Sequence, residues 1–151
     1  MRWMAIDYGS RRIGVAISDF GGTIASPAAV LPGAGTVPAD AHQLVDWARQ
    51  NEVTAIVVGL PLNMDGTAGP QAEISNQLAA ELAQAVPDWP IELWDERLSS
   101  YQADAHLKEA GARPSRRRNL RDALAAQVIL QSFLDVRGTR DQGIQGSRDR
   151  E

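Results

Sequence analysis

The chain has 151 residues, 44% hydrophobic and 23% charged, with a formal net charge of −4, a composition typical of one soluble, folded domain. It has no cysteine, which excludes disulfides and thiolate zinc sites and agrees with a reducing cytoplasm. No apolar stretch approaches the roughly 20 residues that a membrane span requires, and the run before Asp7 is too short for a signal peptide, so we expect a cytoplasmic protein with no membrane partner.

Three strands are expected at the start of the chain. Residues 1–8 and 13–20 read as strands joined by Gly9-Ser10-Arg11-Arg12, a connection of hairpin length that contains glycine. Residues 23–31 read as a third strand after the turn at Gly21-Gly22. These three strands should form an antiparallel meander.

Helices and strands are then expected to alternate. Helical spacing of apolar residues predicts helices over 39–51 and 71–86, and β-branched or short apolar runs predict strands over 55–58 and 91–94. This order implies an α/β fold with a mixed five-stranded sheet, in which two parallel strands continue the three antiparallel ones and helices flank the sheet.

The end of the chain is expected to be helical and then disordered. Further helices are predicted over 100–110 and 119–136. From Gly138 onward Gly, Arg, Asp and Gln dominate, which indicates a disordered tail over 138–151 and a single domain over 1–137.

Two carboxylate positions fall at strand ends. Asp7 ends the first strand, and Asp95-Glu96 end the last one. Ligands of such sheets collect beyond the carboxyl ends of the parallel strands. Alternation does not say whether Asp95 or Glu96 faces Asp7. The alternative readings are a turn-forming aspartate before a glycine at Asp7 and a surface salt bridge from the Asp95-Glu96 pair to Arg97.

A third carboxylate, Asp122, lies inside a predicted helix. Helical spacing puts it in line with an apolar stripe made of Ala125, Ala126, Ile129 and Phe133. A carboxylate on that stripe is costly unless it is paired, protonated or bound to a cation, and a metal ion is the best candidate. A magnesium-type cation prefers oxygen ligands, and two such ions can activate a water and stabilise the leaving oxygen of a phosphodiester.

Arginines are concentrated in two places despite the negative net charge. Arg11 and Arg12 lie beside Asp7, and a run without acidic residues contains Arg113, Arg116, Arg117, Arg118 and Arg121. The planar guanidinium suits phosphate oxygens, so a nucleic-acid partner is expected; the alternative is that the run is only a solvated start of a helix.

Four motifs, in order between positions 7 and about 131, resemble the YqgF (RuvX) family, whose members are described as Holliday junction resolvases and as nucleases that mature the 5′ end of pre-16S ribosomal RNA. The motifs are Asp7-Tyr8-Gly9-Ser10-Arg11-Arg12-Ile13-Gly14-Val15-Ala16, Gly59-Leu60-Pro61-Leu62-Asn63-Met64-Asp65-Gly66, Asp95-Glu96-Arg97-Leu98-Ser99-Ser100, and Asp122 followed by Ala125-Ala126 and Ile129-Leu130-Gln131.

The resemblance implies an RNase H-like fold and a nuclease that uses Mg²⁺ or Mn²⁺. It implies that Asp7, Glu96 and Asp122 are the catalytic metal ligands, and it favours Glu96 over Asp95. Arg97, Ser99 and Ser100 would steady the site or touch phosphate. Arg121 departs from the family, which more often has an apolar residue there, and its orientation stays open.

Three functions follow as hypotheses. The first is a metal-dependent nuclease acting on structured nucleic acid, either an RNA precursor or branched DNA; resolving a junction would need a two-fold homodimer. The second is a catalytically silent nucleic-acid-binding module of the same fold. The third is an ATP-phosphate-binding domain, which the short chain disfavours because such folds need two lobes.

Overall fold

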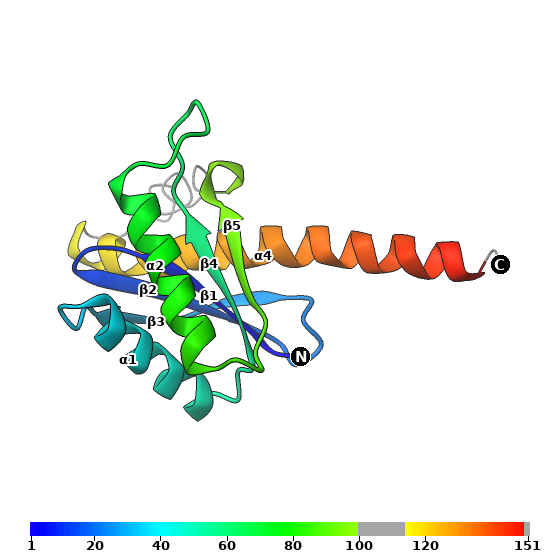
Figure 1. Ribbon diagram of the computed structural model, residues 1–151, viewed down its shortest axis with the longest axis horizontal. Helices are drawn as coiled ribbons and strands as arrows, with labels where there is room; N and C mark the ends of the chain where they lie inside the picture. The colour runs from blue at the N-terminus through cyan, green and yellow to red at the C-terminus, as the bar shows by residue number, and fades with distance from the viewer. Residues whose placement is uncertain (100–113, 150–151) are drawn as a thin grey trace.

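The computed structural model describes the backbone of residues 1–99 and 114–149, and the side chains of residues 1–99 and 121–138 (Figure 1). Its elements in chain order are β1 (Trp3–Tyr8), β2 (Arg12–Ser18), β3 (Ala25–Pro32), α1 (Val37–Gln50), β4 (Ala55–Leu60), α2 (Pro70–Ala85), β5 (Ile91–Asp95), the 3₁₀ helix η1 (Glu96–Leu98) and α4 (Pro114–Asp149). The helix predicted over 100–110 lies outside the described residues.

The strands form the mixed sheet that the sequence predicts. Their spatial order is β3-β2-β1-β4-β5. β1 pairs antiparallel with β2, and β2 antiparallel with β3, whereas β1–β4 and β4–β5 are parallel. Because β1 is central and parallel to β4 and β5, the carboxyl ends of these three strands lie at one edge of the sheet, where Asp7 and Asp95 are placed.

Helices cover both faces of the sheet. Figure 1 shows α1 and α2 side by side on one face and α4 crossing the other. Alternation along β1 feeds both cores: Met4 and Ile6 pack in the core beneath α1 and α2, while Trp3 and Ala5 pack in the core beneath α4. The residues of β1 therefore alternate between two faces of the sheet, and Asp7 falls on the α4 face.

Helix α4 packs through the apolar stripe predicted for it. Ala126, Ile129 and Phe133 are buried, and the Phe133 ring lies 4.7 Å from Trp3 and 5.7 Å from Trp94 between centroids. The backbone of α4 remains helical to Asp149 and extends past the sheet (Figure 1). Most of the segment for which a disordered tail is predicted is therefore helical in the structure. The disorder of residues 138–151 and the domain boundary at residue 137 stay predictions.

None of the helices in the described part of the chain combines the length and hydropathy that a bilayer-spanning segment requires.

Candidate functional site

The carboxyl groups of Asp7 and Glu96 are hydrogen-bonded to each other at the edge where β1, β4 and β5 end. Asp7 is the penultimate residue of β1, and Glu96 opens η1 directly after β5. The chain leaves the extended conformation after Asp95, and the 3₁₀ turn places the Glu96 carboxylate against Gly59 of β4. The structure therefore answers the question that alternation left open: Glu96 lies against Asp7.

Burial dominates the electrostatics of this pair. It raises the pKa of Asp7, to which the charge of Asp122 adds, while the hydrogen bond from Glu96 lowers that pKa. Burial, then the hydrogen bond to Asp7 and its charge, raise the pKa of Glu96 to about 9. At neutral pH, and without a cation, the two carboxyl groups hold a proton between them.

Two glycines on the flanking strands make room for the acids. Gly14 of β2 is directly opposite Asp7, and Gly59 of β4 lies one residue beyond the Ile6–Val58 pair, level with Asp7. A Cβ on Gly14 would collide with the backbone carbonyl of Asp122, and a Cβ on Gly59 would collide with the Glu96 carboxylate. Sequence reasoning missed this role, although glycine inside a strand signals close approach of another group.

The end of β1 is also held from its other face. The Tyr8 hydroxyl donates a hydrogen bond of 2.5 Å to buried Asp40, and Gln71 Nε2 donates to the Tyr8 carbonyl at 2.8 Å. Asp40 accepts a second bond, from the Ala34 amide at 2.6 Å. Burial and the neighbouring Asp40 raise the pKa of Tyr8, so its hydroxyl stays protonated and donates. These bonds fix the strand end that carries Asp7.

Asp122 is half-buried, and its carboxylate is paired with the guanidinium of Arg12. Arg12 Nε lies 2.8 Å from Asp122 Oδ2, and the exposed fractions of the two side chains are 39% and 21%. Of the ways expected to offset this carboxylate, the structure shows pairing, with Arg12 of the β1–β2 hairpin; metal binding at Asp122 stays a prediction. Asp122 also acts on Asp7 through its charge, yet within the described residues no three His, Asp or Glu side chains are already arranged to hold a metal.

The remaining predicted residues are divided between the site and its surroundings. Arg97 pairs with Asp95, its Nε at 2.9 Å and its Nη2 at 2.6 Å from Oδ2, so the predicted surface salt bridge exists for Asp95. Ser99 is buried and its Oγ has no hydrogen-bond partner among the described residues. Ser100 and Arg113 lie outside the described residues.

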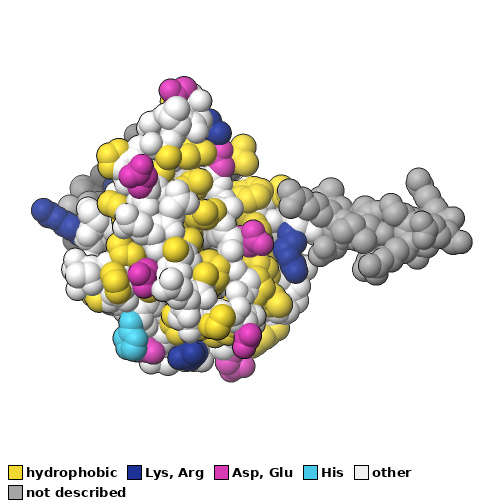
Figure 2. Space-filling view, viewed as in Figure 1, with side chains coloured by type: hydrophobic (Ala, Val, Ile, Leu, Met, Phe, Trp, Pro, Cys, Tyr) yellow, Lys and Arg dark blue, Asp and Glu magenta, His cyan; other side chains and the backbone are white. Residues whose placement is uncertain are grey.

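The arginines of the expected nucleic-acid surface are only partly placed. Residues 116–118 belong to the first turns of α4, where the backbone alone is described. Arg121 is exposed, which settles its orientation away from the sheet, and Arg11 is exposed as well. Figure 2 shows the face with α1 and α2, where acidic side chains are spread among neutral and apolar ones.

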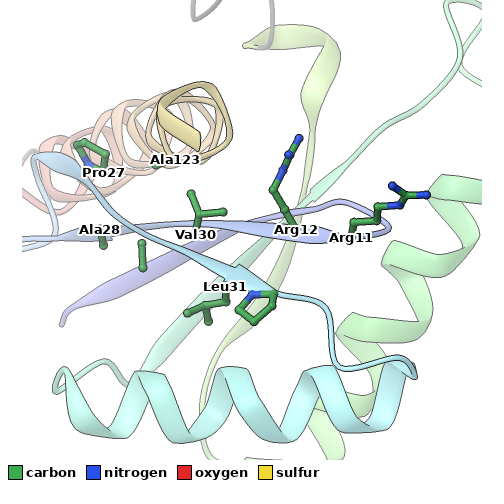
Figure 3. A pocket seen from close by; sticks show the side chains of 9 residues that line it. Arg11, Arg12, Pro27, Ala28, Val30, Leu31 and Ala123 are labelled. Atoms are coloured by element: carbon green, nitrogen blue, oxygen red, sulfur yellow. The ribbon is translucent and has the colours of Figure 1, made fainter. Parts of the chain in front are cut away.

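Two hollows flank the Arg12–Asp122 pair. The smaller, of about 280 Å³, is lined by Gly9, Ser10, Arg11, Arg12 and Asp122. The larger, of about 610 Å³, follows β3 and is lined mainly by apolar residues from 27 to 32, with Ala123 on one side (Figure 3). Both arginines border both hollows, and Figure 3 shows their side chains extending in different directions from the hairpin.

Comparison with known proteins agrees with this architecture. A family model described as "RuvX: Holliday junction resolvase" matches residues 1–136. A relative from Myxococcus xanthus, named "Putative pre-16S rRNA nuclease", is 46% identical over 136 residues, 90% of this chain and 89% of the relative. A relative of the same name from Pelotomaculum thermopropionicum is 44% identical over 138 residues, 91% of this chain and 89% of the relative.

A solved structure shares the fold. RuvC of T. thermophilus in complex with a Holliday junction substrate aligns with a TM-score of 0.55 over 91% of this chain and 95% of that one, at 15% sequence identity. This likeness confirms the predicted RNase H-like fold. With the family model and relatives above 40% identity, it leads to one conclusion: the chain belongs to the RuvX family of nucleases.

Proposed function

We propose that this nuclease hydrolyses phosphodiester bonds in structured nucleic acid with Mg²⁺ or Mn²⁺ held by Asp7, Glu96 and Asp122. The observation that carries the proposal is the hydrogen-bonded Asp7–Glu96 pair at the carboxyl ends of the parallel strands. Two carboxyl groups drawn out of water are costly. A divalent cation with a preference for oxygen ligands would offset that cost by replacing their proton, so the donor set fits the metal.

Each residue has a separate task in this proposal. A bound metal would supply an activated water and stabilise the leaving oxygen. Asp7, fixed by its place in β1, and Glu96, placed by η1, would hold the metal as carboxylates, with their shared proton passing to solvent. Asp122 contributes a third charge close enough to act on Asp7. Arg12 uses Nε on Asp122 and is 39% exposed, so the rest of its guanidinium can meet a phosphate oxygen.

The substrate that we favour is the 5′ end of a pre-16S ribosomal RNA precursor in the cytoplasm. Support comes from the names of the relatives, which are 46% and 44% identical to this chain. The second candidate is a four-way DNA junction, supported by the family model's description. Arginines contact phosphates in either case, and shape decides specificity. A junction would further require a two-fold homodimer, since two symmetric cuts need two sites.

The test of this function is cleavage of matched substrates by one preparation of measured oligomeric state. We expect cleavage of an end-labelled RNA precursor stem in Mg²⁺ or Mn²⁺, none in chelator, and no effect of ATP. Cutting of the DNA junction alone, by a dimer, would favour the second candidate. Binding without cleavage in any metal would indicate a silent module, and a requirement for ATP would indicate the phosphate-binding alternative.

Gly59→Ala tests whether the glycine clearance positions Glu96. The added Cβ would meet the Glu96 carboxylate and lie 2.8 Å from Ile129 Cδ1. Glu96 would have to leave Asp7, and a displacement of about 1 Å can cost roughly 100-fold in rate. We therefore expect a cleavage rate lower by about two orders of magnitude, measured under single-turnover conditions, with nucleic-acid binding retained.

Gly138→Ala is the matched control, because a Cβ there meets nothing within 4 Å. Its cleavage rate should equal that of the wild type. An unchanged cleavage rate in Gly59→Ala, with circular dichroism showing that both variants are folded, would show that cleavage does not depend on the position of the Glu96 carboxylate beside Asp7.

A further inference from the structure

The loop of residues 61–69, which joins β4 to α2, projects from the molecule beside η1 (Figure 1). Met64 in this loop is 94% exposed, more than any other large hydrophobic residue of the described chain. A single exposed apolar side chain is ordinary on a protein surface. This one is unusual because the loop is internally braced and lies next to η1, which begins with Glu96.

Hydrogen bonds within the loop hold its backbone. The Asn63 amide donates to the Thr67 carbonyl at 2.9 Å, and the Gly66 amide donates to the Asn63 carbonyl at 2.8 Å. Gly66 has φ of +87°, a conformation that glycine adopts without strain. Asp65 Oδ1 accepts from the Thr67 amide at 3.0 Å and from its hydroxyl at 2.6 Å. The side chain of Met64 takes no part in this bracing and faces solvent.

Arg97 connects the loop to the end of β5. Arg97 Nη1 lies 3.5 Å from the Met64 carbonyl, while the rest of its guanidinium pairs with Asp95. Arg97 directly follows Glu96, and Leu98 after it is also exposed, at 66%. Hydrogen bonds from Thr67, and only then the charge of Arg97, lower the pKa of Asp65, while the hydrogen bond from Arg97 lowers the pKa of Asp95. The loop that carries the exposed Met64 side chain therefore lies against η1, the turn that begins with Glu96.

We propose that Met64 is a wedge that stacks against the terminal base pair where a nucleic-acid duplex ends, beside the phosphate that is cut. This inference rests on the proposed function. Apolar side chains, methionine among them, insert between base steps and unstack them in proteins that distort nucleic acid. A flexible, polarizable thioether adapts to the face of any base. An RNA stem with a single-stranded extension and the branch point of a DNA junction both have such a duplex end, with the face of a terminal base pair available to Met64.

The test uses both sources of a duplex end as fluorescent probes. One probe is an RNA stem with a single-stranded 5′ extension, and the other is a four-way DNA junction; each carries 2-aminopurine at the terminal pair, where unstacking raises its fluorescence. The proteins are the full chain, Met64→Ala, Met64→Leu, and Ile24→Ala as control. Ile24 is 64% exposed and immediately precedes β3, at the opposite end of the sheet.

We expect the wild type, Met64→Leu and Ile24→Ala to raise the fluorescence of the same probe. Met64→Ala should lose this rise and bind about 3- to 10-fold more weakly. Equal fluorescence and affinity for Met64→Ala and wild type would overturn the wedge, as would the absence of any rise with the wild type. The fluorescence does not depend on cleavage, so a rise without cutting would support the wedge while the proposed nuclease activity fails, and cutting without a rise would do the reverse.

Discussion

Asp7→Asn is expected to abolish cleavage while leaving affinity for nucleic acid within about twofold of the wild type. Asparagine keeps the shape of the side chain and can still hydrogen-bond to Glu96, so the site should remain folded. It removes the central negative charge, which lies between Gly14 and Gly59 and against Glu96. Affinity should persist because it comes mainly from arginine–phosphate contacts. Gel-shift and cleavage assays on one preparation measure both quantities.

The control for this variant is Asp46→Asn. Asp46 is a surface aspartate of α1 whose carboxylate lies 3.3 Å from His42 Nε2 and is 52% exposed. This substitution removes the same charge far from the strand ends and should leave the cleavage rate unchanged. Cleavage by Asp7→Asn at the wild-type rate would remove Asp7 from the mechanism.

Periodicity predicted the sheet and the surroundings of Asp7 well. The alternation in β1 and the continuous apolar run in β4 depend on burial alone, and Met4, Ile6 and Val58 are buried as their spacing indicates. The mixed sheet, in which two parallel strands continue three antiparallel ones, followed from right-handed crossovers. The bounds of the strands changed by only a few residues; β4, for example, continues through Gly59 to Leu60.

The details of the site depend on features that periodicity does not contain. The choice between Asp95 and Glu96 is made by the 3₁₀ turn, which Asp95 caps by accepting from the Arg97 amide at 2.9 Å. Such a turn breaks the alternation at the very residue in question. The family resemblance identified Glu96, because the motif marks which residue carries the functional carboxylate even though it says nothing of the turn that places it.

The partner of Asp122 could not have been predicted from local pattern either. Arg12 and Asp122 are 110 residues apart in sequence, and they meet because Gly14 lets α4 approach β2 at this point. The sequence correctly indicated that Asp122 needs a cation. The sequence did not indicate whether an arginine from the β1–β2 hairpin or a metal ion would neutralise the Asp122 carboxylate.

The metal-free protein is expected to lose stability as pH rises from about 5 to about 9. The folded state raises the pKa of Glu96 from its ordinary 4.5 to about 9, through burial and the neighbouring Asp7 and Asp95. Within this window the unfolded chain releases the Glu96 proton while the folded chain keeps it, so increasing pH favours unfolding. Each tenfold difference in the proton affinity of Glu96 between the folded and unfolded states contributes about 1.4 kcal/mol, which corresponds to roughly 3 to 6 °C in Tm for a domain of this size.

Glu96→Gln should remove most of this dependence and raise the metal-free Tm at pH 8. Glutamine is neutral at every pH and can donate to Asp7 as the protonated glutamate does. Mg²⁺ or Mn²⁺ should raise the Tm of the wild type at pH 8 by binding the folded state, and that of the variant much less. Thermal melts of both proteins between pH 5 and 9, in chelator and then in metal, provide the measurement. A wild-type Tm that stays flat across this range in chelator would show that Asp7 and Glu96 do not share a proton, and an equal response of both proteins to metal would show that Glu96 is not a ligand.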